Sequence, residues 1–233
     1  TIPLALSTRR GLAASPVVAR ADRLVALADH AREVFTRFGA PMDRIDVVPN
    51  GIEPRRHDVS PAPVRPRYLA VGRFSAEKGI EPLLRDWPQD LDLDLVGDGP
   101  LAPSIRAVAG PSVRLLGALD ARWRDEAAAY TAVIAPGLAL EAAVPRVVIE
   151  AWEAGVPVVA REAGGAGLAV TASGAGLTYR DASSLRAALI DAHDRAASLR
   201  AAARAAYEAT YTPQAWLAAM EATYAAALDH RRA

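Results

Sequence analysis

The segment between residues 135 and 165 constrains the fold most, because it predicts a strand, a loop, a helix and a second strand in close succession. The apolar run 130–135 ends at Pro136-Gly137, as a buried strand followed by a turn does. A proline is tolerated in the first turn of a helix, where its missing N–H costs nothing, so a helix is predicted over 145–154. The apolar run 156–160 predicts the next buried strand. Two strands separated by one helix indicate a parallel βαβ unit.

The same segment predicts an anion site. A helix that begins just after the carboxyl end of a strand presents free N–H groups and a positive dipole end, and phosphate commonly binds there. Glu150 lies one turn further along, where a carboxylate can accept both hydroxyl hydrogens of a ribose. Gly155 fits the left-handed end of this helix, and Gly164-Gly165 predicts a loop that a ligand can approach closely. An ordinary helix of an α/β domain is the alternative that these residues leave open.

The rest of the chain repeats this alternation and predicts an α/β fold with a doubly wound parallel sheet. Further strands are predicted at 68–71, 91–96, 113–116 and 176–179, with helices between them and a helix over 184–193 capped by Asp181. In such sheets, ligands bind beyond the carboxyl ends of the strands. Each predicted Gly-rich turn lies at such an end.

The N-terminal part predicts a separate β-α-β piece. A strand over 21–28, a helix from Asp29 to about Phe38 and a strand over 45–48 precede the turn at 49–51. Residues 53–66 contain four prolines and mixed charge, a composition typical of a linker. We therefore divide the chain into an N-terminal piece (1–52), a linker (53–66), a ligand-binding domain (67–210) and a C-terminal helix (211–233).

The C-terminal helix is predicted to begin with Thr212 as its cap and Pro213 at its first position. Trp216, Met220, Tyr224 and Leu228 recur every four residues and form one apolar stripe. Packing of this stripe against the domain is the simplest interpretation.

Composition excludes several other classes. Net charge is +0 and the pI is about 6.9, which disfavours nucleic acid as the main partner. The chain has no cysteine, and its four histidines are scattered, so neither a disulfide framework nor a zinc site is expected. No apolar run reaches the length of about 18 residues that a membrane span needs, and no signal peptide is recognisable. A cytoplasmic location is the default expectation.

The predicted loop 72–79, GRFSAEKG, brings two cations to the edge of the sheet. Arg73 and Lys78 there, close to the predicted helix start, would suit a diphosphate. A solvated surface loop is the alternative. Lys78 is the only lysine among 27 basic residues, which indicates a position where the compact charge of lysine is preferred to the planar fork of arginine.

These segments together resemble a known family. PNGIEP, AVGRFSAEKGIEPLL, LVGDGPL, VRLLG and PRVVIEAWEAGVPVVA, followed by the pair Gly164-Gly165, are similar in order and spacing to the family-4 retaining glycosyltransferases of the GT-B fold. The resemblance covers roughly residues 21–179 and the terminal helix. It implies two Rossmann-like domains, with a nucleotide-diphosphate sugar held mostly by the C-terminal one.

The resemblance also implies roles for individual residues. Arg73 and Lys78 would hold the donor diphosphate together with Gly72 at the start of their loop, and the amides near Val147 and Val148 would cover its distal phosphate. Glu150 would bind the ribose hydroxyls. The implied reaction retains the anomeric configuration, needs no metal or other cofactor, and stabilises the leaving diphosphate through these cations and the helix dipole.

The chain departs from the family pattern in the loop before this helix. The family separates its paired glutamates by seven residues, whereas Glu141 and Glu150 are separated by eight, and a strict alignment puts Ala142 in the first position. Either the loop is one residue longer and Glu141 still contacts the sugar, or that contact is lost. The aromatic-glycine pair of the family is absent from this loop.

Most of the N-terminal domain of the family is not matched. The acceptor site is therefore expected outside these residues, and His30 cannot be matched to the histidine that the family carries there. Peripheral membrane association through that missing part is left open.

The sequence thus predicts the donor half of a glycosyltransferase that is inactive alone and whose acceptor is not identified. A degenerate donor-binding subunit and a nucleotide-sugar 2-epimerase are the alternatives.

Overall fold

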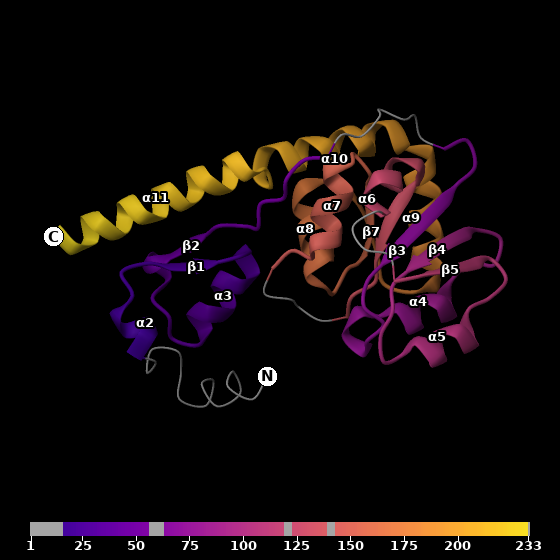
Figure 1. Ribbon diagram of the computed structural model, residues 1–233, viewed down its shortest axis with the longest axis horizontal. Coiled ribbons are helices and arrows are strands. Elements are labelled where there is room, and N and C mark those ends of the chain that lie inside the picture. Colours follow the sequence, from indigo (N-terminus) through magenta and orange to yellow (C-terminus); the bar gives the residue numbers. More distant parts are fainter. Residues whose placement is uncertain (1–15, 56–62, 119–122, 139–142, 233) are drawn as a thin grey trace. The chain divides into compact units, whose positions relative to one another are not determined.

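The computed structural model describes residues 16–55, 63–118, 123–138 and 143–232 (Figure 1). The chain forms two compact units. Unit 1 groups residues within 1–51, 141–144 and 210–233, and unit 2 groups residues within 52–140 and 145–209.

Unit 2 is built on a six-stranded sheet in the order β5-β4-β3-β6-β7-β8, and every neighbouring pair is parallel. The strands are β3 (Arg67–Val71), β4 (Asp92–Val96), β5 (Val113–Gly117), β6 (Ala132–Ala135), β7 (Val158–Arg161) and β8 (Gly176–Tyr179). The predicted α/β fold with a parallel sheet is confirmed.

Helices follow the strands in turn and complete the βαβ units. They are α4 (Ile80–Asp86), α5 (Ala102–Val108), α6 (Trp123–Glu126), α7 (Arg146–Glu153), α8 (Gly165–Ser173), α9 (Ala182–Asp194) and α10 (Ala196–Thr210), with 3-10 turns η3 (Ala76–Lys78) and η4 (Ala127–Ala129). The apolar core joins alternate residues of the central strands, such as Tyr68, Leu93 and Ile134, to side chains of α4, α5 and α9. Helix α7 packs against β6 and β7.

The predicted ends of the helices are confirmed in part. Asp181 caps α9, and its carboxylate accepts from the Ser184 N–H at 2.8 Å. Gly155 takes the predicted left-handed conformation after α7, with φ +67°. Gly165, however, begins helix α8 rather than a loop, because Gly164 supplies the extended residue before it. Helices α8 and α10 were not predicted, since their Ala-rich sequences lack a clear apolar period.

Unit 1 contains α2 (Pro16–Arg20), β1 (Leu24–Ala26), α3 (Asp29–Arg37), η2 (Met42–Arg44), β2 (Ile45–Val47) and α11 (Pro213–Arg232). Strands β1 and β2 are parallel and joined through α3, as predicted. The first strand is shorter than the predicted 21–28. Asp29 is the first residue of α3 and not its cap, because Ala28 holds the capping position without a side-chain bond.

Helix α11 begins as predicted, but its apolar stripe is packed only in part, since Met220 is half-buried and the other three members are exposed. The Thr212 hydroxyl accepts from the Ala215 N–H at 3.1 Å, and Pro213 holds the first position. Trp216, Tyr224 and Leu228 are 41%, 64% and 58% exposed. The face that is buried carries Thr223 instead, since β2 offers the Asp46 carboxylate as a partner for its hydroxyl.

Candidate functional site

The strand order of unit 2 reverses between β3 and β6. The chain proceeds from β3 outward through β4 to β5, and then returns to the other side of β3 with β6. The connections leaving β3 and β6 therefore diverge at the carboxyl edge of the sheet, and such switch points are where open α/β sheets bind ligands. All the predicted donor-binding residues follow one of these two strands.

Backbone atoms crowd together where the loops after β3 and β4 meet. The Phe74 N–H donates to Asp98 O at 2.9 Å, and the Leu101 N–H donates to Phe74 O at 2.9 Å. A Cβ at Gly97 would lie 2.0 Å from Gly72 O, and φ there is +155°, so only glycine fits. A Cβ at Gly72 itself would meet nothing within 4 Å.

The loop after β3 carries a cluster of charges. Arg73 is exposed and Lys78 is half-buried at the end of η3. Between them the Ser75 hydroxyl donates to Glu77 Oε1 at 2.6 Å. That hydrogen bond lowers the pKa of Glu77 most, and the charges of Lys78 and Arg73 lower it further. The two predicted cations thus lie near the Glu77 carboxylate. Glu77 was not among the site residues predicted from the sequence.

The loops after β3 and β6 contact each other directly. The Leu138 N–H donates to Glu77 O at 3.0 Å. A Cβ on Gly79 would lie 2.2 Å from Pro136 O, which explains a glycine with φ +67° at this point. The loop after β7 joins them, because a Cβ on Gly164 would lie 2.6 Å from Gly137 O. The switch point is therefore lined by backbone from the loops that follow three neighbouring strands of the sheet, β3, β6 and β7.

Helix α7 starts at Arg146, with Pro145 as the residue before it. Val147 is half-buried and Val148 is fully buried. The Val148 N–H, predicted to face a phosphate, donates to Pro145 O at 2.9 Å and closes the first turn. The helix dipole remains directed at this end, since it arises from the whole set of aligned peptides.

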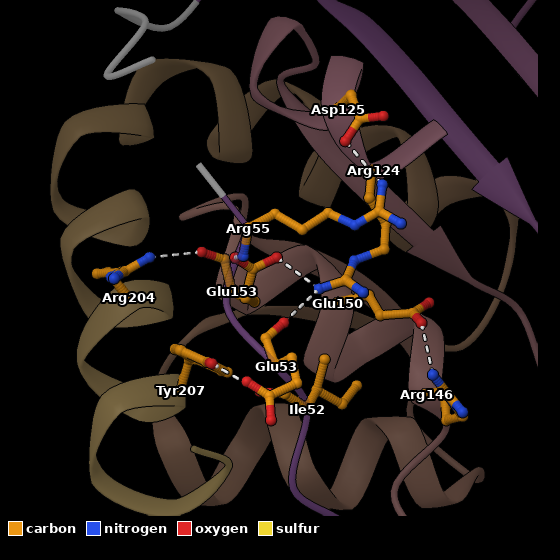
Figure 2. A network of polar contacts seen from close by, with 10 residues as sticks. All are labelled: Ile52, Glu53, Arg55, Arg124, Asp125, Arg146, Glu150, Glu153, Arg204 and Tyr207. Carbon is orange, nitrogen blue, oxygen red and sulfur yellow. Dashed lines mark hydrogen bonds and ion pairs between the residues drawn. The ribbon is translucent and has the colours of Figure 1, made fainter. Parts of the chain in front are cut away.

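Glu150 lies one turn into α7 and is paired with Arg146 (Figure 2). Arg146 Nη2 lies 3.3 Å from Glu150 Oε1. The Glu150 side chain is 13% exposed and that of Arg146 is 71% exposed. Arg146 was not among the residues predicted from the sequence, although the four-residue spacing of a cation and a carboxylate on one helix was a sufficient signal. Glu141, the predicted sugar contact, lies outside the described residues.

No group of three or more metal-ligating side chains occurs among the residues that the structure describes. Within that part of the chain, every helix is too short or too polar to cross a membrane.

Several solved structures have a similar fold. The Staphylococcus aureus TarM G117R mutant, in complex with fondaparinux, alpha-GlcNAc-glycerol and UDP, is 14% identical with a TM-score of 0.73, over 89% of this chain and 45% of that one. Anabaena Alr3699/HepE, in complex with UDP, is 20% identical with a TM-score of 0.75, over 90% and 65%. A glycosyltransferase from Rickettsia africae ESF-5 is 17% identical with a TM-score of 0.76, over 95% and 66%.

These likenesses establish the fold, which is that of the Rossmann-like domains of GT-B glycosyltransferases. The chain spans less than two thirds of the length of these neighbours. No curated protein sequence matches it.

The sequence model of one family matches residues 65–195, which is more than half of the chain and includes both loops of the switch point and helix α7. The chain therefore belongs to the family of glycosyl transferases group 1.

Proposed function

We propose that unit 2 binds a nucleotide-diphosphate sugar over the switch point, and that the protein transfers this sugar to an acceptor with retention and without a metal ion. The observation that carries this proposal is the direct backbone contact between the loops after β3 and β6. That contact joins the loop bearing Arg73 and Lys78 to the segment that leads into α7. The UDP bound in the TarM and HepE structures supports a nucleotide donor.

Each predicted residue keeps a role in this proposal. Lys78 and Arg73 neutralise the diphosphate, and the dipole of α7 adds to their field. Because the Val148 amide already donates to Pro145 O, Val148 sets the start of the helix, and the Val147 amide is the proposed donor to the distal phosphate. Glu150 accepts from the ribose, and Glu141 keeps the proposed sugar contact.

The proposed chemistry places negative charge where these groups are. The bond between the anomeric carbon and the diphosphate oxygen breaks, and its electron pair stays on the diphosphate. The acceptor oxygen bonds to the anomeric carbon on the face that the diphosphate leaves, and its proton passes to the departing diphosphate oxygen. Fixed cations and a helix dipole around the departing diphosphate stabilise the charge that develops in the transition state.

We expect the 233-residue chain to bind a nucleoside diphosphate weakly and to transfer no sugar by itself. All the proposed donor contacts outside the 141–144 loop belong to unit 2, whereas positioning the acceptor contributes much of the rate of such a reaction. Calorimetry with UDP, GDP and ADP, followed by a product assay with donor and mixed acceptors, tests both parts. Sugar transfer by this chain alone would contradict the expectation that it does not position an acceptor. Absence of binding to all three diphosphates would refute the donor site.

A further inference from the structure

The carboxylate of Glu153 is fully buried near the C-terminal end of α7, and the chemistry proposed above does not use it (Figure 2). Its Oε2 accepts from Arg124 Nη2 at 2.8 Å, and its Oε1 accepts from the Arg55 N–H at 2.7 Å. The side chains of Arg124 and Glu153 are 7% and 0% exposed. A buried ion pair is weak evidence for stability, because apolar residues of similar size often stabilise a protein as well or better. The presence of this pair therefore calls for an explanation other than stability.

The partners of this pair identify what it holds. Arg124 Nη2 also donates to Glu53 O at 3.1 Å. The Tyr207 hydroxyl, from α10, donates to Ile52 O at 2.7 Å. Residues 52–55 are thus bound through three backbone groups, by side chains from α6, α7 and α10, and Ile52 itself is buried. Figure 2 shows these side chains converging on the extended segment.

The same carboxylate-bearing residue is fastened to α10 as well. Arg204 Nη1 donates to the backbone oxygen of Glu153 at 2.7 Å. Helix α10 ends at Thr210, where the chain passes from unit 2 back to unit 1. The chain crosses between the units at residues 51–52 and again at residues 209–210. On the unit 2 side these two crossings lie close together, because Tyr207 is bonded to Ile52.

On the unit 1 side the two connections are adjacent again. A Cβ at Gly51 would lie 3.2 Å from Thr212 O and 3.0 Å from the Cβ of Trp216. Gly51 thus packs against the first turn of α11. The hydrogen bonds that hold residues 52–55 to unit 2 begin at Ile52, and the preceding residue, Gly51, already contacts unit 1.

We propose that Glu153 is a positioning residue that fixes the connector 52–55 to helix α7, so that the connector moves as part of unit 2 and bending on this connection begins at Gly51. The inference rests on the proposed function only for the identity of α7 as the donor-binding helix. Its consequence is that the donor helix and the connector keep one geometry whatever unit 1 does. The predicted linker 53–66 is then not flexible over its first residues.

The first test measures the spread of distances between the units. The chain has no cysteine, so spin labels can be attached uniquely at Glu33→Cys on α3 and Ala187→Cys on α9, two exposed positions. Pulsed electron paramagnetic resonance then gives the distance distribution in the full chain. We expect the double variant Glu153→Leu/Arg124→Leu, which keeps the site filled with apolar side chains, to broaden this distribution about twofold. The single variant Tyr207→Phe, which removes one hydrogen bond and no volume, should broaden it less.

A matched control separates clamping from general destabilisation. Asp94→Asn alters another buried carboxylate of unit 2 that pairs with arginines, and none of the contacts of Asp94 involves the connector. It should lower the melting temperature without widening the distribution. Equal widths for the parent and the double leucine variant, or equal broadening by Asp94→Asn, would overturn the inference.

Hydrogen exchange gives a second readout that needs no ligand and no label. The Arg55 amide is bonded to Glu153 Oε1, so its exchange should accelerate at least tenfold in Glu153→Leu/Arg124→Leu and remain unchanged in Asp94→Asn. Unchanged protection of Arg55 in the double variant would show that Glu153 does not hold the connector. Loss of nucleotide binding in calorimetry would affect the proposed function alone, since neither measurement here depends on it.

Discussion

Arg146 and Glu150 lie one turn apart on α7, with Arg146 Nη2 at 3.3 Å from Glu150 Oε1. The two side chains differ in freedom, because that of Arg146 is 71% exposed and that of Glu150 only 13%. The guanidinium can therefore swing into solvent while the carboxylate stays in place. The ion pair therefore does not prevent another donor from approaching the Glu150 carboxylate.

We predict that Arg146→Ala leaves nucleoside affinity unchanged or raises it up to about threefold. An i,i+4 ion pair whose arginine is largely exposed contributes less than about 1 kcal/mol, and its loss leaves the Glu150 carboxylate to the ribose hydroxyls. Calorimetry with a nucleoside that lacks phosphate measures this directly. Glu81→Ala, which breaks an ion pair of the same spacing on α4, is the control. A clear fall in nucleoside affinity would mean that Arg146 itself contacts the nucleoside.

Glu150→Gln should weaken binding of a ribonucleotide and leave the fold intact. The amide keeps one acceptor oxygen but loses the charge that strengthens a hydrogen bond from the ribose. A 2′-deoxynucleotide should lose less affinity on this substitution than the ribonucleotide, as a two-by-two calorimetric comparison would reveal. Equal losses for both ligands would make Glu150 a structural residue.

Lys78→Ala should reduce nucleoside diphosphate affinity roughly 10- to 100-fold, because a hydrogen bond to a charged group contributes about 1.5–3 kcal/mol. Nucleoside affinity should change little. Lys78→Arg should restore only part of the loss, since a planar fork replaces a compact charge. If nucleoside and diphosphate affinities fall together, Lys78 does not act on the phosphates.

Asp94→Asn should destabilise unit 2 by about 2–3 kcal/mol, the loss expected for hydrogen bonds to a charged group. Asp94 is 3% exposed, and accepts from Arg114 Nε at 2.8 Å and from the Tyr130 hydroxyl at 2.7 Å. It also pairs with Arg67, so it joins β3, β4, β5 and the turn before β6. Urea unfolding followed by circular dichroism measures the change. The substitution Asp90→Asn, at an exposed ion pair with Arg186, should change stability by less than about 1 kcal/mol.

Tyr179→Phe should make the protein less sensitive to alkaline pH. Burial raises the pKa of Tyr179 from its ordinary value of 10.0 to about 12, and the charge of Arg161 opposes part of this rise. The unfolded chain therefore releases the Tyr179 proton at a lower pH than the folded protein does. The contribution of the neutral Tyr179 to folding stability is complete below pH 10 and is lost as pH rises through about 12. Two pH units correspond to about 2–3 kcal/mol.

The measurement is urea unfolding at pH 8 and at pH 11.5 for both proteins. The comparison isolates Tyr179 because the single lysine and the five other tyrosines are common to both proteins, and arginine stays protonated in this range. The parent should lose more stability than Tyr179→Phe between the two pH values. Parallel losses would show that Tyr179 ionises in the native state as it does in the unfolded chain.

Local sequence determined the elements and their class. Apolar runs bounded by glycine and proline specify where β3, β4, β6 and β7 occur, because each run buries itself and each breaker ends it. Asp181 and Thr212 specify helix starts through their own side chains. The alternation of strands and helices then leaves a parallel sheet as the arrangement that buries both faces. Glycine suits the positive φ at Gly79, Gly97 and Gly155, and at Gly79 and Gly97 a Cβ would also collide with backbone, so those turns were also readable from the sequence.

Tertiary structure alone decided which loops and charges meet. The strand order β5-β4-β3-β6-β7-β8 puts the loop after β3 beside the loop after β6, although some 60 residues separate the two in the sequence, and no local pattern encodes that pairing. Likewise Glu153 resembles any polar helix residue until packing buries it with Arg124 and against the backbone of Arg55. The partly exposed apolar stripe of α11 shows that a periodic pattern does not guarantee burial. An apolar period specifies a face of a helix but not what covers it. Periodicity is a local property, whereas burial depends on chain segments that are distant in sequence.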